Sequence, residues 1–513
     1  MRKKTWTAGT LCTAMMVASM GTMAMASDSD AAVQAISERK ESGDMPTVVF
    51  AYPTWTGRPA GEDRVQEKLS AITEEELGIK LEIEVLDYGS WQQEMTLMLA
   101  SGEQVDIFNT MGLGYSTCVS KGYALELDDL LNDYGQGILD TINEDYIKAC
   151  KINGEIFGIP QQRDIAQGKG AYIVPTQYLD GIGYDWKSAL DEDGESIYVT
   201  IDDIKEMFVQ LHEKYPDKYV LCPNKGTQLN NMMLFDDIGN DTFGVLLDPE
   251  NSLEVSNLYE SEAFLEACKM FYEWNSEGYI SKDALTDNNT PQQNIAAGLG
   301  ISTLAAYKPG TKMEQMAQIS EDVVVFKTMG TFTKSSAVTS MNWALNSNCE
   351  DPVAAMQVLN LLYTNKEAAT LLAWGEEGTD YVVTDDGFLT YPEGKDATTK
   401  EYSTLNWLMP NQYITGVWEG NPADIYEQTE KFNDESVKSI AMGFTFDNSS
   451  VMAEYTALTN VYNEYINQII LGFVEPESAI AEMNEKLYDA GLQKYMDAKQ
   501  EALNQWAEEN EIQ

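Results

Sequence analysis

The sequence predicts an α/β fold, because strand patterns and helix patterns alternate along its first part. Five segments carry this alternation: strands at 47–52, 79–87 and 105–111, with helices between them at 62–78 and 90–103. Strands joined through helices need crossover connections, which are right-handed and produce a parallel sheet. The last part of the chain, from about 450 to 508, is mostly amphipathic helix and predicts a helical C-terminal region.

Each element of the first part has its own signal. The helix over 62–78 ends in glycine, a residue common just after helices, and the strand over 79–87 alternates apolar and polar residues. Ser90 and Gln93 have the spacing of a capping box at the start of the next helix. Ligands of open α/β sheets bind beyond the carboxyl ends of the strands, so the loops after these strands are the first place to look for a site.

A second α/β region is expected from about 165 to 335. Its helix and strand patterns lie at 200–215, 261–278, 300–307 and 321–329, and a further strand and helix follow at 341–347 and 352–364. A chain of 513 residues, 43% of them hydrophobic, is too long for one core and suggests roughly two to four domains.

The charge excludes nucleic acid as a partner. The formal net charge is −50, from 33 basic and 83 acidic residues spread along the chain. A surface of this charge repels phosphate polyanions.

The N-terminus predicts an exported protein. Arg2, Lys3 and Lys4 precede a short apolar stretch that ends at Ala26 in an A-x-A cleavage motif, so residues 1–26 are predicted to be a signal peptide. Residues 27–45 are polar and are expected to form a flexible leader. No other window is long and apolar enough for a transmembrane helix. Cys12 lacks the residues of a lipobox before it, so the sequence does not support a lipid anchor.

Most catalytic and metal-binding arrangements lack the residues they need. His212 is the only histidine and is expected on a helix surface, so every Ser-His-Asp or Cys-His arrangement would depend on it. There is no P-loop and no Rossmann glycine motif. The five mature cysteines contain no C-x-x-C pair and are expected to be buried thiols, with a single disulfide bridge left open as an alternative.

No cofactor is expected, apart from one weak candidate for calcium. Asp191 and Asp193 offer oxygen ligands in a turn, but the spacing is not that of an EF-hand. A glycoside hydrolase stays open as an alternative, since it needs only two suitably separated carboxylates.

Several motifs resemble one family of transport proteins. The segment "NGEIFGIPQQRDIAQGKGAYIV" (153–174) resembles the region where bacterial extracellular solute-binding proteins of the sugar-binding family 1 cross from their first lobe to their second. "LASGEQVDIFNTMG" (99–112) resembles an earlier motif of the same family. Segments 374–394, 406–433 and 442–465 are similar to the LplA-like lipoprotein branch. The resemblance covers about 45 to 510.

This resemblance implies a two-lobed periplasmic-binding-protein-like fold of type II. Lobe 1 would comprise 46–160 with a return segment at 340–375, lobe 2 would comprise 165–335, and a mostly helical region at 376–513 would pack on the lobes. It also implies a function without catalysis: a monomer captures an oligosaccharide by closing its lobes and passes it to the permease subunits of an ABC importer. A secreted glycan-active enzyme and a surface sugar sensor stay open as alternatives.

The expected site combines aromatic faces with planar hydrogen-bonding groups, because a pyranose has an apolar face and a rim of hydroxyls. The aromatic candidates are Trp55, Trp91, Tyr307, Trp343, Trp374, Trp407, Tyr413 and Trp418, and the polar candidates are Gln162, Arg163, Asp164 and Asn342. If Pro160 marks the hinge, the polar residues after it lie at the floor of the cleft. The alternative is a salt-bridge strap between lobes that does not touch the ligand. Trp274 and Trp506 are expected to be structural.

Overall fold

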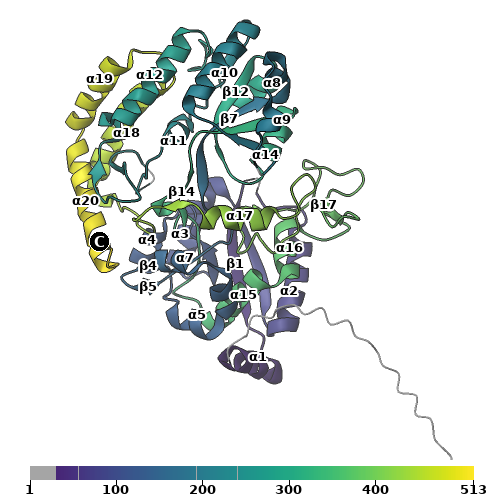
Figure 1. Cartoon of the computed structure of the whole chain (residues 1–513). Coiled ribbons are helices and arrows are strands. Elements are labelled where there is room, and N and C mark those ends of the chain that lie inside the picture. The colour runs from purple at the N-terminus through teal and green to yellow at the C-terminus, as the bar shows by residue number, and fades with distance from the viewer. Residues whose placement is uncertain (1–29, 56, 192, 240, 513) are drawn as a thin grey trace, which may run out of the picture.

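The computed structural model describes residues 30–512 except 56, 192 and 240, and it places two sheet-containing lobes one above the other with a layer of helices along one side (Figure 1). The predicted signal peptide, 1–26, lies outside the described residues. Among the described helices, none combines the length and apolar character that a membrane span requires.

Lobe 1 is built on a five-stranded sheet with the order β2-β1-β3-β15-β6. The strands β1 (Thr47–Thr54), β2 (Lys80–Asp87) and β3 (Ile107–Asn109) are parallel, as their helical connections predict. The strands β15 (Asn342–Leu345) and β6 (Ile159–Pro160) extend the sheet in antiparallel pairing. A strand from the middle of the chain thus completes a sheet that begins near its N-terminus.

Helices cover both faces of this sheet. In β1, Phe50 belongs to the core under α2 (Glu62–Leu77), α15 (Pro352–Thr364) and α16 (Lys366–Trp374), whereas Ala51 belongs to the core under α3 (Tyr88–Ser101). The remaining elements of lobe 1 are short: α4 (Tyr115–Ser120), α5 (Asp128–Tyr134), α6 (Gln136–Thr141), α7 (Glu144–Ala149), β4 (Lys151–Ile152) and β5 (Glu155–Ile156).

The start of α3 differs from the prediction. Asp87, the last residue of β2, accepts a hydrogen bond of 2.8 Å from the amide of Gly89 and caps the helix in place of Ser90 and Gln93. The strand runs into the helix without a loop, which leaves Asp87 in the capping position. The predicted end of α2 is confirmed, because Gly78 follows it in the left-handed conformation with φ 67°.

Lobe 2 is built on a seven-stranded sheet centred on β7 (Gln167–Pro175). Its other strands are β8 (Ser196–Tyr198), β9 (Tyr219–Leu221), β12 (Gly300–Tyr307), β13 (Val323–Lys327), β14 (Thr331–Thr333) and β18 (Val437–Lys438). Its helices are α8 (Thr176–Ile182), α9 (Trp186–Ala189), α10 (Ile201–Lys214), α11 (Gln228–Met232), α12 (Glu262–Ser276), α13 (Pro291–Ala296) and α14 (Thr311–Ile319), and a separate small ladder pairs β10 (Val245–Leu246) with β11 (Val255–Ser256).

The C-terminal helices belong to the core of lobe 2. The helices α18 (Met452–Ile470), α19 (Pro476–Asp489) and α20 (Leu492–Glu509) contribute Ile469, Met483 and Tyr495 to the same buried cluster as Phe208 of α10 and Phe264 of α12. In Figure 1 they form the yellow layer beside the upper lobe. Burying one apolar face of each helix fixes this layer to lobe 2.

Residues 376–424 are irregular where a mostly helical region was expected. They contain only the hairpin of β16 (Val382–Val383) and β17 (Leu389–Thr390) and one turn of 3₁₀ helix. The segment is rich in Gly, Thr, Asp and Pro, which favour turns over helix. Regular helix resumes at α17 (Ile425–Asp434), which lies between the two lobes (Figure 1).

Much of the expected flexible leader is a helix. The helix α1 (Asp30–Ser42) packs on lobe 1 and buries Ala32, whose carbonyl accepts a hydrogen bond of 3.1 Å from the Gln357 amide. The Arg39 guanidinium donates to the carbonyl of Leu77 at 3.1 Å and to Gln357 Oε1 at 2.7 Å. These contacts with α2 and α15 give the polar segment an anchor that its composition does not reveal.

Candidate ligand-binding site

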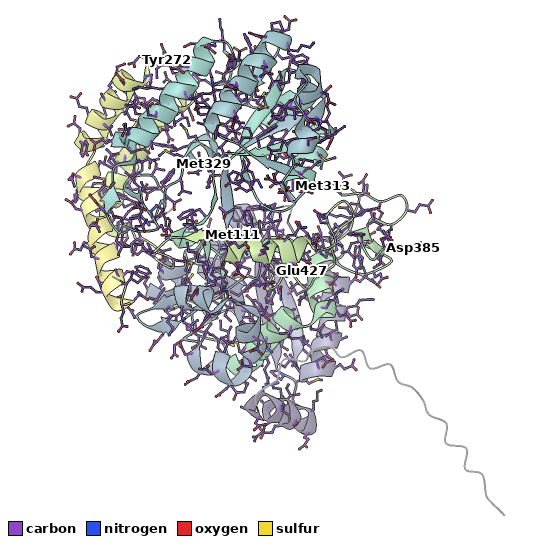
Figure 2. The ribbon with its side chains drawn as sticks, in the orientation of Figure 1. Met111, Tyr272, Met313, Met329, Asp385 and Glu427 are labelled. Atoms are coloured by element: carbon purple, nitrogen blue, oxygen red, sulfur yellow. The ribbon has the colours of Figure 1, made fainter. Side chains whose placement is uncertain are left out.

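A pocket of about 240 Å³ lies where the two lobes meet the irregular C-terminal segment. We call it the aromatic pocket; its lining includes Asp164, Lys308, Trp374, Trp418 and Tyr426. Asp164 lies on the segment that crosses between the lobes, Lys308 follows β12 of lobe 2, and Trp374 ends α16 of lobe 1. Figure 2 labels Met313 of α14 and Glu427 of α17, one residue on each of two helices that contribute to the lining.

Aromatic rings form one wall of this pocket. Trp374 and Trp418 meet edge to face with ring centroids 5.3 Å apart and an interplanar angle of 73°. Tyr391 packs on the other side of Trp418 at 4.6 Å. Both tryptophans are half-buried, so part of each indole is free to contact a ligand.

The indole N–H groups of Trp374 and Trp418 are buried and have no hydrogen-bond partner among the described residues. Buried donors are almost always paired in native proteins, so two unpaired ones in one pocket need an explanation. A ligand with hydroxyl groups would supply the missing acceptors.

Charged groups at the pocket are paired. The Lys308 ammonium lies 2.8 Å from Asp164 Oδ2 and 3.1 Å from Glu314 Oε1. Burial lowers the pKa of Lys308, but the attraction of Asp164 and Glu314 outweighs it and the net shift is upward. The lysine therefore stays charged and holds both carboxylates in place.

The family follows from comparison with known proteins. Residues 59–369 match the family model described as bacterial extracellular solute-binding protein. The chain belongs to this family. A second match, over 440–508, is to a domain of unknown function that corresponds to α18–α20. The family predicted from the sequence motifs is thus confirmed.

Three relatives show how far the likeness extends. A carbohydrate ABC transporter substrate-binding protein of Streptococcus pneumoniae is 25% identical over 455 residues, 88% of this chain and 89% of the relative. The lipoprotein LipO of Bacillus subtilis is 25% identical over 388 residues, 71% of this chain and 73% of that protein. The crystal structure of the N-glycan transport solute binding protein (NgtS) from Streptococcus pneumoniae superposes with a TM-score of 0.76 at 22% identity, covering 90% of this chain and 99% of that one. The predicted two-lobed α/β fold is therefore confirmed.

Three of the twelve predicted site residues line the aromatic pocket of this solute-binding protein: Asp164, Trp374 and Trp418. Three more, Gln162, Arg163 and Tyr413, form hydrogen bonds between two segments that contribute to the lining. Arg163 and Tyr413 connect the crossing segment to the C-terminal segment, because the tyrosine hydroxyl donates to the Arg163 carbonyl at 2.6 Å. The backbone N–H of Gln162 donates to the Pro410 carbonyl at 2.9 Å. Burial lowers the pKa of Arg163, which Asp164 partly offsets.

Three predicted site residues are buried in lobe 1, which corrects the expectation. The Trp91 indole donates to the Met111 carbonyl at 2.7 Å, and Trp343 stacks on Phe50 with centroids 4.4 Å apart. Asn342 is equally buried and donates to Cys150 Sγ at 3.1 Å. All three side chains turn toward the sheet core, so none of them presents a surface to a ligand.

The remaining candidates lie apart from the pocket. Trp55 is 48% exposed after β1 and meets Tyr88 edge to face at 4.0 Å, while Trp407 is partly buried against the core of lobe 1. Tyr307 is largely buried beside a neighbouring groove, where its hydroxyl donates to the Met329 carbonyl at 2.8 Å. Figure 2 places Met329 at the end of lobe 2 that faces lobe 1, and Met111 at the opposing end of lobe 1.

The site contains residues that the sequence reading missed. Lys308, Tyr391 and Tyr426 contribute to the pocket or its wall. The only local signal was for Lys308, which follows an apolar strand pattern and precedes the turn residues Pro309 and Gly310.

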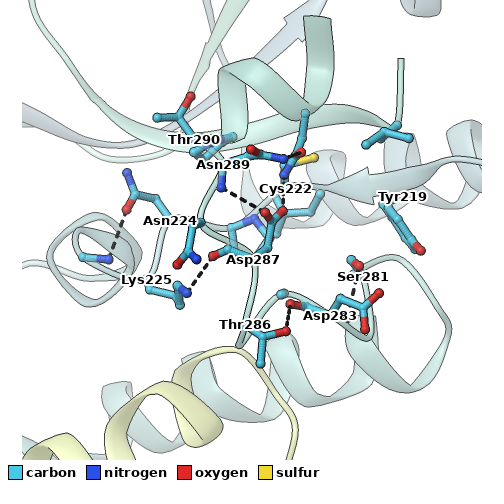
Figure 3. Close-up of a pocket in the computed structure, with 18 residues that line it drawn as sticks. Tyr219, Cys222, Asn224, Lys225, Ser281, Asp283, Thr286, Asp287, Asn289 and Thr290 are labelled. Carbon is cyan, nitrogen blue, oxygen red and sulfur yellow. Dashed lines mark hydrogen bonds between the residues drawn. The ribbon is translucent and has the colours of Figure 1, made fainter. Parts of the chain in front are cut away.

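A larger pocket of about 640 Å³ lies within lobe 2 but is a weaker candidate (Figure 3). Its ammonium group, Lys225 Nζ, donates to the carbonyls of Leu285 at 3.1 Å and Asp287 at 2.7 Å. The Asp287 carboxylate accepts from the Asn289 amide at 2.9 Å and from Asn294 Nδ2 at 2.6 Å, and these bonds lower its pKa. The two charged groups at Lys225 and Asp287 are therefore already engaged within the pocket.

At the candidate calcium site, Asp191 and Asp193 both pair with a lysine. Lys327 Nζ lies 3.1 Å from Asp191 and 3.4 Å from Asp193, which supplies the positive charge that those carboxylates need. Within the described part of the chain, no group of three or more His, Cys, Asp or Glu residues could hold a metal ion. His212 packs against Tyr279 with ring centroids 4.9 Å apart, more buried than the expected surface position.

Proposed function

We propose that this solute-binding protein captures an oligosaccharide between its lobes, outside the cytoplasmic membrane, and delivers it to the permease subunits of an ABC importer. The observation that carries the proposal is the pair of unpaired indole N–H groups at Trp374 and Trp418, two half-buried rings that line one pocket. Aromatic faces suit the apolar side of a sugar ring, and the N–H groups suit its hydroxyls.

The names and ligands of the relatives also support the capture of an oligosaccharide. The Streptococcus pneumoniae relative is named as a carbohydrate receptor of an ABC transporter, and NgtS is known in complexes with Man1GlcNAc and Man5GlcNAc. This chain has the same fold and the same family membership.

Hydrolysis is less well supported by the pocket. Its carboxylates, Asp164 and Glu314, both pair with Lys308. Hydrolysis with a general acid needs a carboxyl that is free to reach the glycosidic oxygen, whereas both of these carboxylates are held by one ammonium. The pocket therefore fits sugar binding better than hydrolysis.

The test is calorimetric titration of the mature protein with a panel of oligosaccharides, followed by analysis of the recovered sugar. We expect saturable binding, intact sugar, and a loss of affinity of about tenfold or more in Trp418→Ala. Tyr488→Ala, which removes a partly exposed ring on the outer helix α19, is the matched control. Cleaved sugar would contradict the receptor function.

A further inference from the structure

The aromatic pocket is small for an oligosaccharide. Its volume of about 240 Å³ is below the range of ~300–1,000 Å³ usual for ligand pockets. A bound oligosaccharide would extend beyond the pocket, so the surface next to the pocket would contact the rest of the ligand.

A larger groove of about 840 Å³ adjoins the pocket, and we call it the side groove. Lys308 and Pro309 line both spaces and form their common border. The groove runs between the edge of the lobe 2 sheet and α17, where its lining includes Tyr198, Tyr307 and Phe432.

An exposed aromatic ring, that of Tyr198, lines the side groove. Tyr198, at the end of the edge strand β8, is 54% exposed. The Lys327 ammonium lies between two rings, 5.3 Å from the Tyr198 centroid and 5.7 Å from that of Tyr307. Phe432 meets Tyr307 edge to face at 6.0 Å and connects this cluster to α17. The rings are held in place by their neighbours, which reduces the entropy cost of stacking a sugar on them.

The lysines of the side groove are all engaged with carboxylates. Lys312 lies 3.1 Å from Asp322 Oδ1, and Lys431 lies 3.8 Å from Glu435 Oε1. Lys308 and Lys327 form the ion pairs described above. No ammonium among the residues that line the groove is left over to attract an anionic sugar, and the protein as a whole carries a charge of −50.

We infer that the side groove binds the outer units of a neutral oligosaccharide whose terminal unit occupies the aromatic pocket, so that the chain of the ligand passes over Lys308 and Pro309. This inference rests on the proposed function and extends it to the length and charge of the ligand. Tyr198 is its specificity-determining residue, because it contacts only ligands long enough to reach it.

The test compares four proteins on a glycan array of neutral oligosaccharides, from disaccharides to octasaccharides, with sialylated counterparts. The proteins are the wild type, Trp418→Ala, Tyr198→Ala and Tyr198→Phe, and affinities for the best ligands are then measured by calorimetry. Tyr198 is exposed, so its replacement should leave the fold intact, which thermal unfolding of each variant verifies.

We expect Trp418→Ala to lower the affinity for every ligand. Tyr198→Ala should lower the affinity for the long ligands only, by about tenfold, and Tyr198→Phe should bind about as tightly as the wild type. If Tyr198→Ala binds long ligands as well as the wild type while Trp418→Ala does not, the extension into the side groove is wrong and the proposed function stands. Preference for the sialylated sugars would overturn the neutral assignment. Failure of every oligosaccharide to bind would overturn both proposals.

Discussion

The Asp164 carboxylate and the Lys308 ammonium lie 2.8 Å apart and join the segment that crosses between the lobes to the end of β12. The pair is partly shielded, with side-chain exposures of 21% and 34%. It borders both the aromatic pocket and the crossing segment, so it links the geometry of the site to the relative position of the two lobes.

Asp164→Asn should separate these two roles. The ammonium keeps Glu314 at 3.1 Å, so the free energy of unfolding should fall by only about 1 kcal/mol or less. Sugar affinity should fall further, because the variant loses a charged acceptor at the pocket. Urea unfolding and calorimetry measure the two effects, and Asp202→Asn, in an exposed pair with Lys205, is the control. Equal losses in stability and affinity would contradict a role in the site.

Lys499→Met should destabilise the C-terminal helical layer. The lysine is fully buried and lies 2.9 Å from Asp241, so its removal leaves a buried carboxylate with neutral donors only and should cost about 3–5 kcal/mol. Lys494→Met is the control on the same helix, where an exposed lysine pairs with Glu454 at 2.6 Å and should contribute about 1 kcal/mol or less. Similar urea midpoints for both variants would show that the buried pair does not hold the layer.

Glu62 should make stability depend on pH. Burial raises its pKa to about 7 from the ordinary 4.5, even though Arg58 pulls it down. As the pH rises from 4.5 to about 7, the unfolded chain releases this proton while the folded protein keeps it, so stability falls by on the order of 3 kcal/mol. Below 4.5 both states hold the proton and the stabilisation is fully present.

Glu62→Gln should remove that fall. The variant should unfold at higher urea concentration than the wild type at about pH 8 and differ little at about pH 4. The neighbouring Asp63→Asn, whose side chain is 91% exposed, should follow the wild type at both pH values. A Gln variant with the same pH dependence as the wild type would assign the effect to other groups.

Trp91→Ala and Trp55→Ala should differ strongly in stability. Trp91 is fully buried, and its truncation should cost about 3–5 kcal/mol. Trp55 is 48% exposed, and its truncation should change stability by about 0.5 kcal/mol or less. Thermal or urea unfolding measures both, and a small effect at Trp91 would mean that this ring is available to a ligand after all.

The sequence could predict the strands and helices of lobe 1 because hydrophobic periodicity acts locally. It could not decide which way Trp91 points, since a residue in the first turn of a helix can face the sheet or the loop. It could not predict α1, whose polar residues become ordered through Gln357 and Leu77, far along the chain. Tertiary contact, absent from local patterns, decides such cases.

The types of residue at the candidate site could be predicted from the sequence, but the particular set of residues that meet there could not. Trp374, Trp418 and Asp164 were predicted as site residues and do line one pocket, while their contact with a sugar stays a prediction. Their meeting with Lys308 brings together four distant parts of the chain, and no spacing in the sequence specifies that. Trp343 lies on a strand whose alternate residues face opposite sides, and a single sequence does not say which side borders the cleft.

The two ends of the described chain are fixed to different lobes. The helix α1 is bonded to α15 of lobe 1 through Gln357, whereas α20 is bonded to lobe 2 through Lys499 and through Gln500, whose amide donates to the Leu253 carbonyl at 3.0 Å. Whatever is attached near the start of α1 therefore travels with one lobe, and whatever is attached after α20 travels with the other. With a donor and an acceptor fluorophore at these two positions, the efficiency of energy transfer would report the distance between the lobes with and without ligand.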